Sequence, residues 1–380
     1  MDSYFKNKLL VKYKQDDKET NENIVNCNVV NVDSKSNNIY YTTSIVNRLV
    51  YNPPDPVRSI PKRAELQFTR NVKILSDPNN YRCCITRLSI PSNAIPLFLF
   101  SKEDATYTVT LSYDPGLTPA DIIQETVNVN YIQSNIGDPY EQYQPVYYVQ
   151  EMLNFVNTAY DIAYNNIVTA VALAGFVYEP TAPPKIIFNQ ETKLLELIAS
   201  DFYENINQYG LFMNKPLFDD FFSGFYSKEV LFGANNFNGI QLLVQDFGNN
   251  KQEIPSGSGD FFTIMKEEFS SIPLFNKTDR IIVSSNMIPV QPQFIATQQD
   301  IQLNVLLDFI VPDTYIDRRR LEYDPKIYKW YDLRQQQQLT KFDLKYYILY
   351  EDGNVIELFI NGNQRVDQTI LFTPKGTMYQ

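Results

Sequence analysis

Residues 63–100 contain two hydrophobic patterns separated by one turn, and they predict the first β-strands of the chain. Apolar and polar positions alternate from residue 65 to residue 74, the period of a strand with one buried face. The apolar positions are Leu66, Phe68, Val72 and Ile74. Residues 76–80, SDPNN, predict a turn because proline fixes φ and asparagine tolerates left-handed backbone. Residues 81–90 are apolar on both faces and predict a more central strand, which Pro91 ends.

Strand patterns of this quality return only from residue 280 onward. They cover residues 280–283, 303–311, 342–350, 355–360 and 369–372. Asp352-Gly353 and Asn361-Gly362 suit type I′ turns between the last strands. We therefore predict a mainly β chain in which strands before residue 100 and after residue 280 form one antiparallel sandwich. The segment between them is an insertion into that sandwich.

The insertion has secondary structure of its own. Apolar residues recur at helical spacing over residues 147–174, which predicts a long amphipathic helix. Residues 185–188 and 194–198 flank the turn NQET and predict a hairpin. A helix start is expected in residues 214–222, where Pro216 lies near the first turn. Residues 256–259, SGSG, predict a flexible loop tip.

Charge separates the insertion from its flanks. Residues 101–275 contain 22 acidic and 7 basic residues, a net charge of −15, and every basic residue is lysine. The whole chain carries −11, so the remainder carries +4 and all the arginines. We therefore divide the chain into an N-terminal arm (1–60), a sandwich (61–100 plus 276–380) and an outward-facing α+β insertion (101–275).

The first sixty residues are polar and lack sustained periodicity until residue 39. Their beginning is locally basic, with Lys6, Lys8, Lys12 and Lys14 against Asp2. Two interpretations stay open: a solvated, flexible terminus, or an arm that contacts a neighbouring subunit or a polyanion. No signal peptide is expected, and the longest apolar run, residues 167–178, is too short to span a bilayer.

Composition excludes several kinds of chemistry. The chain has no histidine, which removes Ser-His-Asp and Cys-His catalysis and histidine metal ligands. Its cysteines are Cys27, Cys83 and Cys84. Adjacent residues on a strand point to opposite faces, so these cysteines predict buried small side chains and no disulfide framework. A net charge of −11 disfavours sequence-specific nucleic-acid binding.

The remaining candidates for chemistry are weak. Asp219 with Asp220 and Glu267 with Glu268 are adjacent carboxylates, which usually form a solvated face, whereas catalysis needs them opposed across a cleft. Gly257 and Gly259 lack the context of a phosphate-binding loop. The run Arg318–Arg320 predicts surface salt bridges or, alternatively, pairing with an acidic surface of a neighbouring subunit. We expect no catalytic residue, no cofactor-binding residue and no metal ligand.

Two blocks of sequence resemble the penton, or minor capsid, proteins of virophages and polinton-like viruses. The first is NNYRCCITRLSIP at residues 79–91, followed by IPLF at 95–98. The second runs from IIVSSNMIPV at 281–290 through LLDF at 306–309 and WYDL at 330–333 to YYILYEDG at 346–353. The insertion is also similar, at PPKIIF (183–188) and NKPLFDDFF (214–222). The first sixty residues match nothing in the family.

The resemblance implies a single jelly-roll β-sandwich interrupted by a large insertion. It also implies a homopentamer at the fivefold vertices of an icosahedral virion, in contact with double-jelly-roll trimers of the major capsid protein. The insertion would face outward toward the host or giant-virus surface, and synthesis would take place in the host cytoplasm. There are two rival interpretations. A receptor- or glycan-binding adhesin would form a trimer. A β-sandwich hydrolase with two carboxylates would need an apolar cleft in which the two acids face each other.

Overall fold

The computed structural model divides the chain into two compact units. One unit consists of the two flanks, which stop at Pro96 and resume at Lys277, and the other consists of the chain between them. The residues described are 11–13, 24–33, 37–47, 62–69, 73–101, 106–116, 121–130, 143–232, 237–248, 250–255, 261–295, 301–312, 318–335 and 337–376. The predicted loop at residues 256–259 lies outside them.

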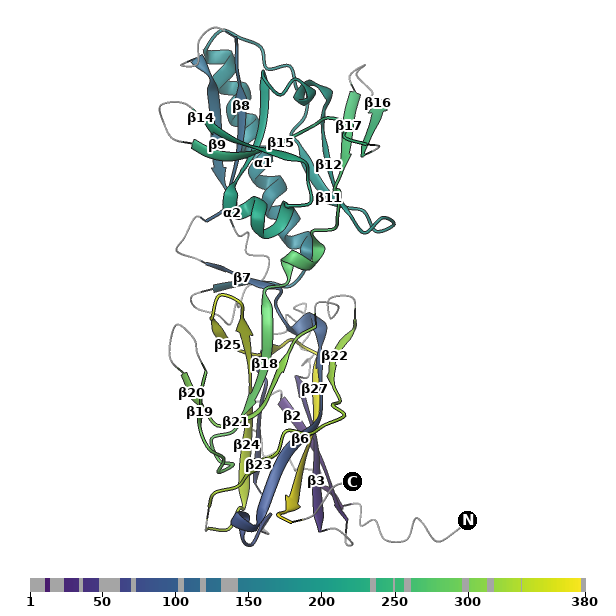
Figure 1. Cartoon of the computed structure of the whole chain (residues 1–380), viewed down its shortest axis with the longest axis vertical. Coiled ribbons are helices and arrows are strands. Elements are labelled where there is room, and N and C mark those ends of the chain that lie inside the picture. Colours follow the sequence, from purple (N-terminus) through teal and green to yellow (C-terminus); the bar gives the residue numbers. More distant parts are fainter. Residues whose placement is uncertain are drawn as a thin grey trace, which may run out of the picture. The chain divides into compact units, whose positions relative to one another are not determined.

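Two antiparallel sheets build the first unit (Figure 1). The seven-stranded sheet has the order β1-β2-β3-β27-β6-β22, with β23 paired to β6. Its strands are β1 (Val11–Tyr13), β2 (Ile24–Asp33), β3 (Asn38–Asn47), β27 (Arg365–Pro374), β6 (Tyr81–Pro91), β22 (Arg320–Tyr323) and β23 (Tyr331–Asp332). The five-stranded sheet has the order β21-β18-β24-β25, with β5 paired to β24. Its strands are β21 (Val305–Ile310), β18 (Thr278–Ser284), β24 (Lys341–Tyr350), β25 (Val355–Glu357) and β5 (Glu65–Thr69).

The order of these strands is that of a jelly roll. Labelled B to I along the chain, the eight main strands are β3, β5, β6, β18, β21, β22, β24 and β27. The first sheet then contains B-I-D-G and the second contains C-H-E-F. The second unit is inserted between strands D and E. Two strand pairs complete the first unit: β4 (Lys62–Arg63) with β26 (Phe359–Ile360), and β19 (Gln293–Ile295) with β20 (Ile301–Leu303).

Aromatic rings fill the core between the two sheets. Tyr41 of β3 lies 5.3 Å from Phe68 of β5 and 5.6 Å from Phe342 of β24, measured between ring centroids. Phe372 of β27 lies 5.8 Å from Tyr41 and 6.2 Å from Phe342. These edge-to-face and tilted contacts are geometries that stabilise aromatic pairs beyond their buried area. The alternating pattern predicted for residues 65–69 is confirmed, because Leu66 and Phe68 are buried between exposed or half-buried neighbours.

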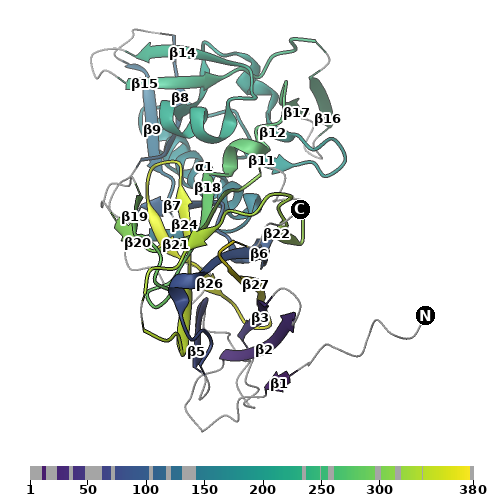
Figure 2. The ribbon, with the colours of Figure 1, turned by 60° about the horizontal axis from the view of Figure 1, so that its bottom comes forward.

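Residues 38–47 require a correction of the predicted N-terminal arm. β3 lies inside the first sheet, paired on one side with β2 and on the other with β27 over eight residue pairs (Figure 2). Tyr41 and Ile45 of this strand are buried. The arm therefore cannot extend to residue 60. The alternation of apolar and polar residues in β3 is obscured because Thr43, a polar residue, also points inward. The Thr43 hydroxyl accepts a hydrogen bond from the Gln368 amide at 3.0 Å.

Both predicted type I′ turns have a different geometry. Gly353 donates its N–H to the Tyr350 carbonyl at 2.9 Å and has φ +83°, while Asp352 is not left-handed. This is a three-residue loop whose glycine takes the left-handed position. In the second turn the left-handed residue is Asn363, with φ +64°, and Gln364 donates its N–H to the Asn361 carbonyl. The turn positions were predicted correctly, but positive φ is taken by Gly353 without Asp352 in the first turn and by Asn363 in the second.

The second unit contains a long helix and two sheets. The sheets are β14-β15-β13-β8-β9 and β11-β12-β17-β16. Their strands are β14 (Ser227–Phe232), β15 (Phe237–Leu242), β13 (Tyr209–Asn214), β8 (Thr108–Tyr113), β9 (Ile123–Asn128), β11 (Lys185–Phe188), β12 (Leu195–Ser200), β17 (Phe261–Lys266) and β16 (Lys251–Pro255). A further pair joins β7 (Phe98–Ser101) to β10 (Tyr143–Val146).

Helix α1 (Val149–Leu173) is amphipathic as the sequence predicts. Glu151 accepts the N–H of Tyr148, the N-cap residue, at 3.3 Å and thereby satisfies a backbone group that the helix start leaves free. One face is fully buried and contains Met152, Val156, Tyr160, Ala163 and Ile167. The predicted hairpin is confirmed as β11 and β12. The helix start at residues 214–222 is confirmed as α2 (Lys215–Leu217), which Asn214 caps and which continues as a π-helical turn, Phe218–Phe222.

Candidate functional site

The adjacent carboxylates Asp219 and Asp220 lie on the π-helical turn and serve separate local contacts. Asp219 pairs with Lys215 one turn earlier at 3.3 Å. Asp220 accepts the Tyr107 hydroxyl at 2.9 Å. The two side chains do not face each other across a cleft, so they do not form an acid–base pair.

Glu267 and Glu268 differ in their exposure to solvent. Glu267 is buried, and its Oε2 accepts the Leu195 N–H at 2.8 Å and the Ser271 N–H at 3.4 Å. Loss of hydration raises the pKa of the Glu267 carboxyl, because burial penalises its charged form. Glu268 is exposed. One carboxylate thus anchors the turn after β17 while the other faces solvent, an arrangement that supports structure and does not support hydrolysis.

The arginine run is divided between the core of the first sheet and its surface. Arg320 donates through Nε to the Ser89 hydroxyl at 2.6 Å and through Nη2 to the Arg365 carbonyl at 2.8 Å. It also forms a salt bridge with Asp367 at 3.2 Å. Arg320 therefore ties β22 to β6 and β27 within one chain, which is the salt-bridge interpretation. Arg318 and Arg319 are exposed.

The outer face of the first sheet is polar and built from short side chains. Thr42 and Thr369 share a 3.0 Å hydrogen bond across β3 and β27, and the Ser44 hydroxyl donates to Asp367 at 2.5 Å. A shallow hollow of about 200 Å³ opens on this face and is lined by Thr42, Arg87, Arg365, Asp367, Gln368 and Thr369. Such a flat polar surface suits contact with another polar protein surface.

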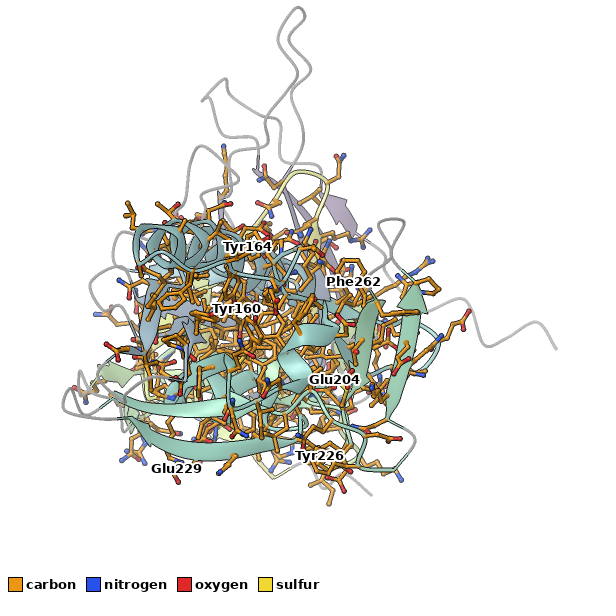
Figure 3. The ribbon with its side chains drawn as sticks, turned by 90° about the horizontal axis from the view of Figure 1, so that it is seen from above. Tyr160, Tyr164, Glu204, Tyr226, Glu229 and Phe262 are labelled. Atoms are coloured by element: carbon orange, nitrogen blue, oxygen red, sulfur yellow. The ribbon has the colours of Figure 1, made fainter. Side chains whose placement is uncertain are left out.

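A second, acidic hollow lies in the inserted unit. It measures about 350 Å³ and is lined by Glu179, Asp201, Phe202, Glu204, Asn205, Gln208 and Tyr209. The Tyr209 hydroxyl donates to Glu179 at 2.7 Å, and Lys251 pairs with Glu204 at 2.7 Å. Figure 3 shows Tyr160 in the interior of the inserted unit and Glu229 at the outer edge of the unit in that view. Sequence reasoning missed this hollow, because six of its seven residues lie in the segment 201–209 and Glu179 joins them only in the folded chain.

The two cysteines of β6 are shielded from reaction because both are buried. Cys83 and Cys84 are free and buried, and burial raises the pKa of both thiols, that of Cys84 to about 12. They therefore behave as small hydrophobic side chains, as predicted. Gly257, Gly259 and the Cys27 side chain lie outside the described residues. Across the described ranges no group of histidine, cysteine and carboxylate side chains could hold a metal ion, and no helix is long and apolar enough to cross a membrane.

The sheets B-I-D-G and C-H-E-F define a jelly roll, a fold found in viral capsid proteins. The chain belongs to the Sputnik minor capsid protein V18/19 family, whose model matches residues 39–373. The family resemblance indicated by the two sequence blocks, including the likeness to the Sputnik virophage penton, is thereby confirmed. Among curated protein sequences none matches this chain.

Solved structures show the same fold. The cryo-EM structure of the Sputnik virophage at 3.5 Å contains a chain that is 20% identical, with a TM-score of 0.63. That match covers 89% of this chain and 98% of the Sputnik chain. The crystal structure of the mavirus penton protein is 13% identical, with a TM-score of 0.60 and coverage of 89% and 99%. The single jelly-roll prediction is confirmed, and the chain is a viral capsid protein of the virion.

Proposed function

We propose that this chain is the penton capsomer of an icosahedral virion, a homopentamer at the fivefold vertices. The observation that carries the proposal is family membership over residues 39–373, combined with the B-I-D-G and C-H-E-F sheets. Five copies of one protomer close into a ring through heterologous contacts, in which two different surfaces of the same protein meet. The role is structural, and no step of it requires catalysis.

The outer face of the first sheet is our candidate for the contact between neighbouring jelly rolls. Threonine and serine side chains make this face polar. Arg87 and Arg365 pair with Glu322 and Asp367 within the chain, and their remaining N–H groups can donate to carboxylates of the adjoining surface. The exposed Arg318 and Arg319 offer the same chemistry at the end of the sandwich where β6 finishes. Trimers of the double-jelly-roll major capsid protein are the second partner that we propose, surrounding each vertex.

The inserted unit is proposed to face outward and to contact the host or giant-virus surface. Its net charge of −15 and its lack of arginine support a hydrated position away from the anionic genome. The acidic hollow supplies carboxylates and two aromatic rings, Phe202 and Tyr209, whose centroids lie 6.0 Å apart. We propose synthesis in the host cytoplasm before assembly.

Native mass is the test of the assembly. Sedimentation of the purified chain at high concentration, alone and with the major capsid protein, is expected to show a species of five protomers. Fivefold symmetry in electron micrographs of that species would support the same conclusion. A stable trimer would contradict the penton assignment and favour a fibre or adhesin. Substituting Arg87→Glu together with Arg365→Glu should weaken the pentamer, whereas Lys185→Glu with Lys228→Glu in the inserted unit should not.

A further inference from the structure

One end of the jelly roll carries a concentration of basic side chains. β6 begins at this end, where Asp332 is opposite Arg82 and the Lys375 N–H donates to the Asn80 carbonyl. The bridge between Leu75 and Leu339 brings the loop before β24 to the same end. The basic residues of this end are Lys73, Arg82, Arg334, Lys341 and Lys375, and Lys375 pairs with Asp332 at 4.0 Å. This basic end is a local positive region on a chain whose net charge is −11.

A large apolar side chain projects from the loop that runs beside β6, between the pair Tyr323–Leu88 and the pair Tyr331–Cys83. Ile327, in the loop between β22 and β23, is 87% exposed, the highest value for any large hydrophobic residue among those described. Lys326 and Lys329 flank it, and Tyr328 and Trp330 follow as half-buried rings. An exposed isoleucine held between two lysines has no role in the core of the sandwich, since it contributes almost no buried area.

The neighbouring rings are held in place. The guanidinium carbon of Arg82 lies 4.5 Å from the centroid of the Trp330 ring, a cation–π contact. The rings of Tyr328 and Trp330 meet edge to face at 6.2 Å. The Lys329 ammonium lies 5.4 Å from the centroid of the Tyr331 ring. Aromatic and cationic side chains that contact one another therefore lie next to Ile327 in the loop.

We infer that the loop between β22 and β23, together with the adjoining basic end, docks onto an anionic lipid bilayer, with Ile327 inserted among the acyl chains. Tyrosine and tryptophan favour the membrane–water interface, where an apolar ring and a polar group are both accommodated. Lysine and arginine bind the acidic head groups, and their aliphatic parts cover apolar surface. A single aliphatic side chain with surrounding cations gives weak, reversible binding, which several copies in one assembly would strengthen.

The loop favours lipid over nucleic acid as the anionic partner. Nucleic acids are bound by cations on phosphates and by rings that stack on bases. An isoleucine that protrudes beyond the neighbouring rings contributes to neither contact, whereas it gains from transfer into hydrocarbon. Salt screens the attraction over about 8 Å at physiological ionic strength, so the basic end acts locally despite the acidic remainder of the chain. The inference concerns each protomer and does not depend on the proposed pentamer.

The test is co-sedimentation of the full chain with two kinds of vesicle. One kind is pure phosphatidylcholine, and the other contains phosphatidylserine at one part in four. We expect binding to the second kind, reduced by high salt. Ile327→Ser should weaken it roughly 60-fold, since it removes three inserted carbons and each contributes about 0.8 kcal/mol. Replacing Lys326 and Lys329 by alanine should weaken it about 25-fold, roughly fivefold for each cation near the surface.

Matched variants separate docking from general effects. Ile310→Ser removes another isoleucine, 67% exposed, from β21 of the same sandwich, and it should leave binding unchanged. Lys185→Ala with Lys228→Ala removes the same charge from the inserted unit and should also be neutral. Equal binding to both kinds of vesicle, or equal loss in Ile327→Ser and Ile310→Ser, would overturn the inference. Binding to duplex DNA without binding to acidic vesicles would overturn it in favour of nucleic acid.

Discussion

Replacing the whole inserted unit by a short linker is expected to leave a folded jelly roll. The change joins Pro96 to Lys277 through about six Gly and Ser residues. The Pro96 carbonyl accepts the Thr278 hydroxyl at 2.9 Å and the Tyr350 hydroxyl at 3.2 Å, so the two ends of the insertion are fixed next to each other by the sandwich itself. The linker has only a short gap to span.

The expected cost is small relative to the stability of a domain. The logarithmic term for closing a six-residue loop is about 1.6 kcal/mol, against roughly 5–15 kcal/mol for the unfolding of a typical domain. We expect a soluble protein with a strand-rich circular dichroism spectrum, resistance to protease and one cooperative thermal transition. Phe342 is fully buried among three aromatic rings, so adding Phe342→Ala to the linker variant should cost about 3–5 kcal/mol, and that variant, fully unfolded in urea, marks the unfolded state in the same assays.

An unfolded linker variant would refute the reasoning. If its spectrum and protease sensitivity matched those of the unfolded Phe342→Ala linker variant, the inserted unit would be required for the core of the sandwich. The division of the chain into a sandwich and a separately folded insertion would then be wrong. A control in which Thr278→Val is introduced into the full-length chain measures the junction hydrogen bond alone, which we expect to contribute about 1 kcal/mol.

Three further predictions concern the strand, the arginine and the carboxyl described above. Deleting residues 1–35 should lower the melting temperature because it removes β2 from the edge of β3, whereas deleting residues 1–10 should not; equal melting would mean that β2 contributes nothing. Arg320→Met should destabilise the chain by about 1–2 kcal/mol in urea unfolding, while the exposed Arg319→Met should change it little. The raised pKa of Glu267 means that the folded unit binds its proton more tightly than the unfolded chain, so stability should fall as pH rises from the ordinary carboxyl range through the raised pKa. Glu267→Gln should remove that slope in thermal melts, and Glu268→Gln should keep it.

Much of the sandwich was predictable because its strands alternate or are continuously apolar. Strand β5 shows the alternation, and β6 shows the apolar run of a strand paired on both sides. β3 was missed because polar Thr43 points inward and Tyr40 lies on the opposite face, so neither period 2 nor a continuous apolar run is visible. Pairing with β27, more than 300 residues later, fixes this strand, and local sequence contains no trace of that partner.

For the candidate sites, too, some features could be predicted from sequence and others could not. Sequence predicted that the adjacent acids form solvated faces, which holds for the exposed Asp219 and Glu268 but not for Glu267, which is buried. It could not show that Arg320 reaches across β6 to Asp367, or that Glu267 is buried beneath a turn. It also could not assemble the basic end, because Arg82, Arg334 and Lys375 come together only after the strands have paired.

The two buried thiols of β6 give the chain a built-in reporter of opening. All three cysteines precede residue 97, so the inserted unit contains none. Cys83 and Cys84 lie on a strand paired on both sides, and a thiol reagent reaches them only when the first sheet separates. Their labelling rate therefore measures the lifetime of the closed jelly roll in the intact particle, independently of any motion in the insertion. Fast labelling of these thiols during uncoating would indicate a capsid whose sandwich opens, and slow labelling would indicate one that releases whole, folded subunits.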